Sequence, residues 1–183
     1  TSFATNLLGH FLLTNLLIDK LEAPARIVNV SSGGMYTQRI RVDDLQMERG
    51  RYDGAAAYAR SKREQVILTE LWADALRTRG VVVHSMHPGW ADTPGVSDSL
   101  PRFYKLTKPL LRTPAQGADT IVWLCASDAA AQSTGQFWHD RKPRPTHRFQ
   151  GTKETEAERQ TLWRRLSELS GWSGSLSGLA EAS

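Results

Sequence analysis

The sequence predicts an α/β protein built around a parallel sheet. Short apolar and β-branched segments have the composition of buried strands, at 26–34, 81–86 and 135–138. Segments of helical composition precede, separate and follow them, at 2–20, 56–79, 113–127 and 155–169. This alternation of strands and helices is typical of a parallel sheet whose crossover connections are helices.

The first helix is expected to be buried on more than one side. Its apolar residues lie nearly all round: Phe3, Leu7, Leu8, Phe11, Leu12, Leu13, Leu16, Leu17 and Ile18. A helix of this kind packs against a sheet and, on another face, against a partner subunit. Pro24 ends it, and the strand at 26–34 closes on small residues that open a loop at its carboxyl end.

The remaining elements follow from local signals. Gly80 stops the helix over 56–79, and the strand at 81–86 ends in a turn of small residues at 87–89. Residues 95–113 have the mixed composition of a flap. A helix begins at Thr113-Pro114-Ala115-Gln116, which combines a cap threonine, a first-turn proline and a glutamine three residues after the cap. Residues 170–183, rich in Gly and Ser, are expected to form a flexible tail after a domain spanning 1–169.

Composition and charge limit the class of protein. The chain has 183 residues, 40% of them hydrophobic, and a net charge of +4, as expected of an ordinary globular domain. Its positive residues form no basic stripe with interleaved aromatics, so a nucleic-acid partner is not expected. The single Cys125 excludes an intrachain disulfide and a cysteine-based zinc cluster. This cysteine usage favours a reducing compartment such as the cytoplasm.

Other charged and histidine residues carry no predicted site. His84 and His87 lie at a strand end, do not share a face and have no evident third ligand, so no metal site is predicted. His10, His139 and His147 are interpreted as ordinary isolated histidines. The acidic residues at 154–158 indicate a solvated helix start, and the basic cluster at 141–148 indicates a solvated connector.

Tyr58 and Lys62 form the pattern with the most specific chemistry. Two residues four apart on a helix lie one turn apart on the same face. An ammonium beside a phenol favours the phenolate, which eases proton transfer near neutral pH. Tyr58 is therefore a candidate general acid/base whose pKa Lys62 would lower. The alternative is an exposed Tyr/Lys pair without a function, which is common on helix surfaces.

Four segments in a fixed order resemble the short-chain dehydrogenase/reductase superfamily, and within it the retinol-dehydrogenase-like group. They are Asn-Leu-Leu-Gly-His-Phe at 6–11, Ile-Val-Asn-Val-Ser-Ser at 27–32, Tyr-Ala-Arg-Ser-Lys at 58–62, and His-Pro-Gly-Trp-Ala-Asp-Thr at 87–93. The gap of 26 positions from Ser32 to Tyr58 is longer than in compact members and matches an insertion in that group. The resemblance implies a Rossmann-like doubly wound parallel sheet.

The resemblance also implies a hydride transfer between NADP or NAD and a carbonyl or alcohol. Ser32 would hydrogen-bond the substrate oxygen, Tyr58 would pass the proton, and Lys62 would hold the cofactor ribose and lower the pKa of the tyrosine. Asn6 would hold a water in the proton relay. The cofactor would further contact Val30, Ser31, Tyr58, Pro88, Gly89, Trp90 and, at the nicotinamide carboxamide, Thr93. The structural alternatives are a strand-end serine at Ser32, a polar residue near a helix start at Asn6 and a helix cap at Thr93.

The Gly-rich turn that grips the cofactor pyrophosphate in this superfamily is absent from the sequence. The chain also opens within a helix and without a start methionine. We therefore expect the carboxyl-terminal half of the fold only, without its first strands. The choice between NAD and NADP stays open, as does a membrane anchor in the missing part.

Three functions are weighed. The first is an oxidoreductase for a small substrate, expected to be hydrophobic or lipid-like because of the apolar residues at 96–111. The second is a truncated, non-catalytic association module, since in the family the helices matching 2–20 and 56–79 pack across a homo-oligomer interface. The third is an epimerase or dehydratase of the extended branch, which the short segment after the flap disfavours.

Overall fold

The protein folds around a sheet of four strands, three of them parallel. The computed structural model describes residues 2–94, 105 and 107–181. Within this part the strand order is β1 (Arg26–Val30), β2 (Val82–Met86), β3 (Phe137–His139) and β4 (Lys142–Arg144). β1 pairs with β2 from Arg26–Val82 to Val30–Met86, β2 pairs with β3, and both pairs are parallel, whereas β4 is antiparallel to β3. The sheet is thus the predicted parallel sheet with one added edge strand.

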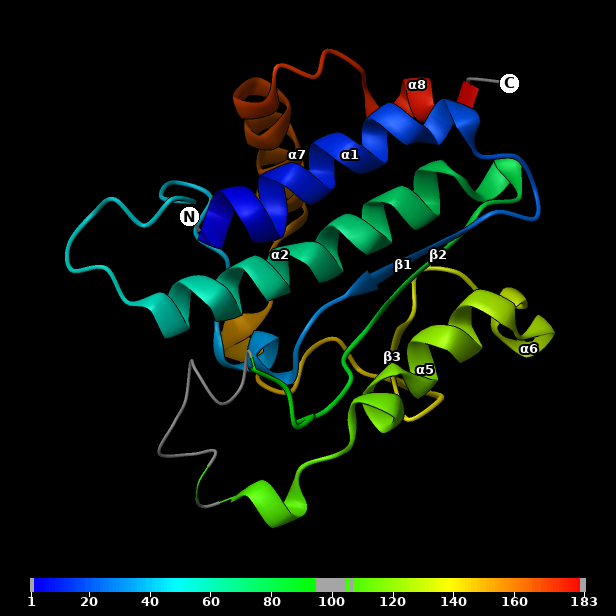
Figure 1. The fold of residues 1–183 in the computed structure, drawn as a ribbon. Helices are drawn as coiled ribbons and strands as arrows, with labels where there is room; N and C mark the ends of the chain where they lie inside the picture. The colour runs from blue at the N-terminus through cyan, green and yellow to red at the C-terminus, as the bar shows by residue number, and fades with distance from the viewer. Residues whose placement is uncertain (1, 95–104, 106, 182–183) are drawn as a thin grey trace.

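Helices cover both faces of this sheet. The long helix α2 (Gly54–Ala75) lies on one side, beside the first helix, and α5 (Pro114–Ala126) with α6 (Asp128–Ala131) lies on the other (Figure 1). Side chains alternate accordingly along the strands. Ile27 and Val83 pack in the core cluster of α2, and Val28 and Met86 pack in the cluster of α5.

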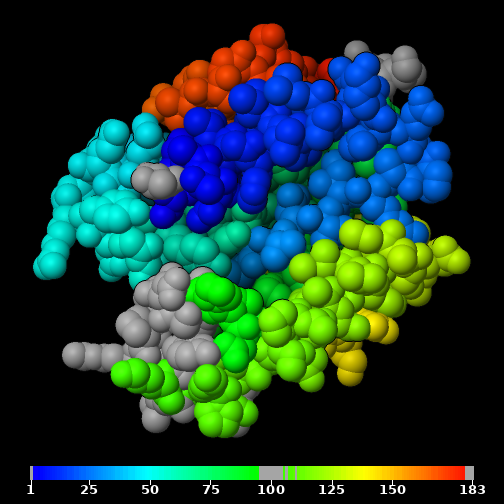
Figure 2. All heavy atoms as spheres, viewed as in Figure 1, coloured from blue at the N-terminus to red at the C-terminus, as the bar shows by residue number. Residues whose placement is uncertain are grey.

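The first helix changes type along its length. It contains a π-helical turn (Ala4–Leu8), the helix α1 (Gly9–Leu17) and a 3-10 turn (Ile18–Lys20), so the helical segment predicted over 2–20 is confirmed. Leu7, Phe11 and Ile18 are fully buried in the core. Leu13, Leu16 and Leu17 are 58%, 61% and 48% exposed, so the second apolar face is open to solvent here. Figure 2 shows the surface of α1 in blue on this open face.

Local capping residues set the ends of the other helices, largely as predicted. Asp53 caps α2 by accepting from the amides of Ala55 and Ala56, and Gly80 follows it in the left-handed region at φ 65°. Thr113 and Gln116 form the predicted capping box of α5. The helix α7 (Glu156–Ser170) starts with a second capping box, formed by Thr155 and Glu158.

Three segments differ from the expectations. β4 lies within the basic connector, where Pro143 is tolerated because the strand is at the sheet edge. Residues 170–183 were expected to be a flexible tail, but they include the helix α8 (Leu176–Glu181), whose Leu179 is 5% exposed and belongs to the main core. Glu154 is buried rather than solvated. The expected flap at 95–113 lies mainly outside the described residues.

Shorter elements complete the fold. They are η3 (Gly33–Thr37), η4 (Arg77–Arg79), η5 (Lys108–Leu110) and η6 (Gln150–Thr152). None of the helices in the described part has the length and apolar character that a membrane span requires.

Candidate active site

The candidate site residues gather at the carboxyl ends of β1 and β2. Past Val30 the chain enters η3 through Ser31 and Ser32, and past Met86 it turns at His87. A methyl group built on Gly33 would lie 3.6 Å from the His87 ring, so the two loops are in contact. The carboxyl edge of a parallel sheet is where α/β proteins bind ligands.

Tyr58 and Lys62 lie together on α2, as their spacing predicts. The Lys62 Nζ is 5.6 Å from the centroid of the Tyr58 ring. It donates to the carbonyl of Val30 at 3.0 Å and to the Oε1 atom of Gln65 at 3.2 Å. Burial lowers the pKa of Lys62 below its ordinary value. Tyr58 is 42% exposed, so its phenol is accessible to a ligand, whereas hydrogen bonds hold the neighbouring Lys62 in place.

The two serines that follow β1 have different environments. Ser31 is buried, and its hydroxyl donates to the backbone carbonyl of Lys62 at 2.7 Å, which ties β1 to α2. Ser32 caps η3, where its Oγ accepts from the Gly34 amide at 3.3 Å. Because a hydroxyl that accepts can still donate its own proton, Ser32 keeps a donor for another group.

Ser32 also lies next to the part of α2 that carries Tyr58. A methyl group built on Gly34 would be 3.7 Å from the Oγ of Ser32 and 3.8 Å from the Cβ of Ala59. Ala59 directly follows Tyr58 in the sequence. The structure therefore brings Ser32, Tyr58 and Lys62 to one edge of the sheet.

Asn6 lies in the π-helical turn that faces α2. Its side-chain amide donates to the hydroxyl of Ser61 at 3.4 Å, and Ser61 donates to the carbonyl of Tyr58 at 2.7 Å. Its backbone carbonyl accepts from the Nε2 atom of Gln65 at 2.5 Å. The main chain of Asn6, rather than its side chain, is thus the part linked to Lys62 through Gln65. Single π-helical turns are frequent at functional sites.

The turn after β2 requires glycine at position 89. Gly89 has φ 78°, and a methyl group built on it would come within 2.9 Å of the Nε atom of Arg112. Arg112 donates to the Pro88 carbonyl at 3.3 Å and to the Asp140 carboxylate at 2.8 Å. Trp90 is 52% exposed.

Thr93 lies just beyond a short backbone contact between two segments. The bridge pairs Ala91 with Arg112, and the Arg112 amide donates to the carbonyl of Trp90 at 2.9 Å. Thr93 itself is half-buried and comes two residues after this bridge. It therefore lies four residues after Gly89, on the segment that follows β2.

His87, for which no metal site is predicted, lies in a stack of rings. Its ring stacks on His139 at 3.8 Å between centroids and on Phe137 at 5.7 Å. Burial, and next the nearby His139, lower the pKa of His87 to about 4, so the ring is neutral at physiological pH. His87 follows β2, and His139 is the last residue of the neighbouring parallel strand β3, which is the signal that could have paired them. Among the described residues, no group of three or more His, Cys, Asp or Glu is placed to bind a metal.

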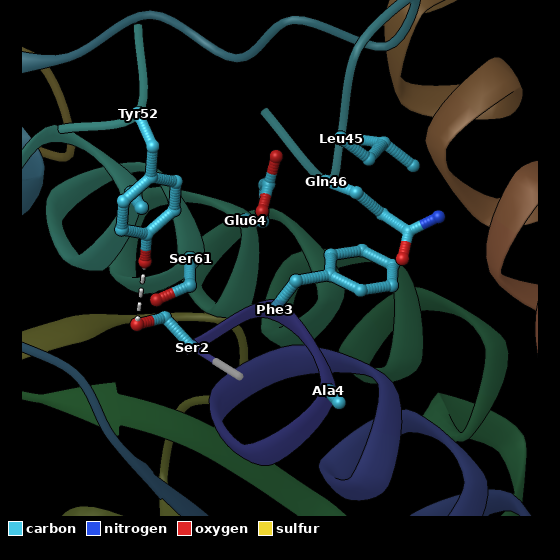
Figure 3. A pocket seen from close by; sticks show the side chains of 9 residues that line it. Ser2, Phe3, Ala4, Leu45, Gln46, Tyr52, Ser61 and Glu64 are labelled. Carbon is cyan, nitrogen blue, oxygen red and sulfur yellow. Dashed lines mark hydrogen bonds between the residues drawn. The ribbon is translucent and has the colours of Figure 1, made fainter. Parts of the chain in front are cut away.

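A small pocket lies beside the candidate site. It has a volume of about 80 Å³ and is lined from α2 by Ala57, Ser61 and Glu64 and from the first helix by Ser2, Phe3 and Ala4. Figure 3 shows the hydroxyls of Ser2, Tyr52 and Ser61 pointing toward one another, with Ser2 and Tyr52 3.4 Å apart. Burial raises the pKa of Glu64 to about 8. Neither Tyr58 nor Lys62 lines this pocket.

Sequence reasoning missed Gln65, which contacts Asn6, His10 and Lys62. Its position three residues after Lys62 on the same helix is a signal that could have found it.

Comparisons with known proteins identify relatives of the chain. No family model matches the chain. The chain is 48% identical over 172 residues to dehydrogenase/reductase SDR family member 12 of Bos taurus, covering 92% of this chain and 54% of that protein. It is 36% identical over 146 residues to retinol dehydrogenase 12 of Homo sapiens, covering 78% of this chain and 46% of that protein.

A solved structure shares the fold. An uncharacterized protein from Mycobacterium Paratuberculosis superimposes with a TM-score of 0.70 at 25% identity, covering 92% of this chain and 58% of that one. The chain spans about half the length of the curated relatives it matches. Its sheet is accordingly part of a Rossmann-like α/β fold, and the chain belongs to the short-chain dehydrogenase/reductase superfamily, in its retinol-dehydrogenase-like group.

Proposed function

We propose that the protein is an NAD(P)-dependent oxidoreductase that interconverts a carbonyl and an alcohol through Ser32, Tyr58 and Lys62. The observation that carries the proposal is the position of the Tyr58–Lys62 pair. Its ammonium is anchored to the end of β1, 5.6 Å from the phenol ring, at the carboxyl edge of the sheet. Relatives named as dehydrogenases and reductases support the reaction class.

The proposed chemistry assigns one task to each side chain. In the reductive direction the hydroxyl of Ser32 donates to the substrate carbonyl oxygen, and Tyr58 gives its proton to the same oxygen as negative charge develops there. In the oxidative direction Tyr58 removes the alcohol proton. The positive charge of Lys62 stabilises the phenolate in both directions. A bound nicotinamide cofactor supplies or accepts the hydride at the substrate carbon.

The described residues offer a fitting place for that cofactor. Lys62 lies beside the carbonyl of Val30, where it could also reach a ribose hydroxyl. Pro88 and Gly89 would contact the cofactor through their backbone, in a turn where a side chain at position 89 would collide with Arg112. We assign Ser31, Trp90 and Thr93 to the rim of the same cofactor site. The cofactor is NAD or NADP.

The proposed substrate is small and hydrophobic. The apolar residues of the 96–111 sequence support this, as does the name of one relative, retinol dehydrogenase. The proposal covers the substrate class and not a particular compound.

A second candidate function is association with another copy of the chain. Three exposed leucines on α1, Leu13, Leu16 and Leu17, favour it, since solvent-exposed apolar side chains that lie together mark interaction surfaces. This function is compatible with the first, and a protein that bound no cofactor but formed dimers would favour it alone.

The decisive experiment replaces Tyr58 with Phe in the purified protein. We expect NADPH- or NADH-dependent turnover of a panel of apolar aldehydes and alcohols to fall by about 10²-fold or more, because general acid/base catalysis contributes about 10²–10⁴-fold. Calorimetric titration should show that Tyr58→Phe still binds the cofactor. Tyr52→Phe is the matched control, because it removes another exposed tyrosine hydroxyl. Full turnover by Tyr58→Phe would reject the mechanism.

A further inference from the structure

The side-chain amide of Gln65 makes a set of hydrogen bonds that joins three elements. Gln65 is 2% exposed. Its Oε1 atom accepts from Lys62 at 3.2 Å, and its Nε2 atom contacts the carbonyl of Asn6 and the Nδ1 atom of His10, each at 2.5 Å. One oxygen and two N–H groups are all that a glutamine amide offers, and each has a partner.

The chemistry of the neighbours fixes which way this amide points. The Lys62 ammonium can only donate, so it requires the amide oxygen. The Asn6 carbonyl can only accept, so it requires the amide nitrogen. The second N–H of the same nitrogen then meets the Nδ1 atom of His10, which must act as an acceptor. His10 is therefore held in its neutral form, with its proton on Nε2.

His10 lies at the surface of the first helix, whereas Lys62 is partly buried. We propose that Gln65 is a positioning residue that holds the Lys62 ammonium at Tyr58 and couples it to the protonation state of His10. A proton added at the Nδ1 atom of His10 removes the acceptor for the Gln65 amide. The amide loses one of its three anchors, and the contact of Gln65 with Lys62 loosens. The assignment of a role at Tyr58 rests on the proposed function, but the coupling itself does not.

The charges around this set are compatible with the coupling. Among the described residues, Tyr58 from α2 and His10 from the first helix are titratable groups near Lys62, and β1 contributes the neutral carbonyl of Val30. Burial, and next the charge of Lys62, lower the pKa of His10. A hydrogen bond with the Asn6 backbone opposes these two effects, but on balance the pKa of His10 is lowered, which favours the neutral imidazole that the geometry requires.

The first test reads the tautomer of His10 without any substitution. Imidazole ¹⁵N NMR of the purified protein, above the pKa of His10, should show a proton on Nε2 and none on Nδ1. The opposite tautomer would overturn the proposal, because Nδ1 could not then accept from Gln65. This measurement requires neither cofactor nor turnover, so it judges the coupling whatever the activity assay shows.

The second test replaces Gln65 with Glu, which puts a carboxylate between Lys62 and His10. We expect the pKa values of both groups, followed by ¹³C and ¹⁵N NMR, to rise by about 1 unit, since a new opposite charge within contact favours the charged forms. In the active protein, the Tyr58-dependent limb of the pH–rate profile should move in the same direction. A side chain at position 65 that did not contact both groups would change stability without moving these values.

Glu64→Gln is the matched control for this substitution. It changes the preceding side chain of the same helix, which is equally buried but lines the small pocket instead. It should leave the pKa values of Lys62 and His10 in place. Unchanged pKa values in Gln65→Glu would overturn the proposal, as would equal shifts in the control.

Discussion

Lys62 and Arg63 are neighbours on α2, but their positive charges have different partners. Lys62 is partly exposed and donates to two neutral oxygens, those of Val30 and Gln65. Arg63 is 1% exposed and donates to the buried carboxylate of Glu154 at 2.7 Å. The electrostatic field of a cation with neutral partners still acts on other groups, whereas an adjacent carboxylate largely cancels the field of the cation that it binds.

Arg63 connects α2 to two other segments of the fold. Its guanidinium also donates to the Thr146 carbonyl and lies beside His147 and the sulfur of Met35. These contacts fasten η3 and the connector after β4 to α2. One helix can therefore carry a charge that influences a neighbouring reactive group, at Lys62, beside a charge that holds the fold together, at Arg63. Substitutions on the two faces of α2 should separate these two roles.

Arg63→Met should produce the largest loss of stability. It leaves Glu154 buried without its main partner, and breaking a buried pair costs about 3–5 kcal/mol. We expect the lower end of that range, because Arg159 remains 3.3 Å from the other oxygen of Glu154. Urea denaturation measures the free energy of unfolding.

Two further variants separate pairing from packing. The double variant Arg63→Met/Glu154→Leu should recover most of the loss, since it leaves no buried charge unpaired. Arg164→Gln removes one of the two exposed arginine partners of Glu168 and should cost far less than Arg63→Met, because exposed ion pairs contribute little to stability. Equal losses for Arg63→Met and Arg164→Gln would contradict the structural role of Arg63.

Glu64, the next residue of α2 after Arg63, is a buried carboxyl with no charged partner in the described part of the chain close enough to keep it ionised, and burial raises its pKa to about 8. A carboxyl whose pKa is raised in the folded state contributes its full stability below the unfolded value, near pH 4.5, and loses it as pH rises through 8. The glutamine of the Glu64→Gln variant cannot ionise, so this variant should not lose stability in this way as the pH rises. Relative to the native protein, we expect a gain on the order of 2–4 kcal/mol between pH 5 and pH 9.

Thermal or urea unfolding at several pH values measures this gain. Parallel stability curves for the two proteins would show that Glu64 ionises freely in the folded state. Because Asp44 is also a buried acid, but one whose pKa is lowered by hydrogen bonds from the Glu48 and Arg49 amides, Asp44→Asn serves as a control of opposite sign.

Local signals account for what the sequence predicted well. The capping box at Thr113, the stop at Gly80 and the spacing of Tyr58 and Lys62 each involve residues a few positions apart. The same holds for the three parallel strands, whose apolar composition reflects burial on both faces. The gathering of Ser32 and Lys62 at one edge follows from the strand order.

Contacts between distant segments could not be predicted in this way. β4 has three residues and exists through its pairing with β3, and α8 is held by the burial of Leu179 despite its Gly- and Ser-rich sequence. Arg63 and Glu154 are 91 positions apart, and His139 contacts the carbonyl of His87 across 52. No periodic pattern records such pairs, because only the folded chain brings them together.

Lys62→Met should have a small effect on stability and a large one on the proposed activity. The side chain is partly exposed and its partners are neutral oxygens, so we expect the free energy of unfolding to change by less than about 1 kcal/mol. Turnover should fall by about 10²-fold or more, because Tyr58 loses the charge that stabilises its phenolate. Lys142→Met, at an exposed position of β4, is the control for removing a lysine. A stability loss as large as that of Arg63→Met would mean that Lys62 holds the fold together as Arg63 does, and the division between the two faces of α2 would fail.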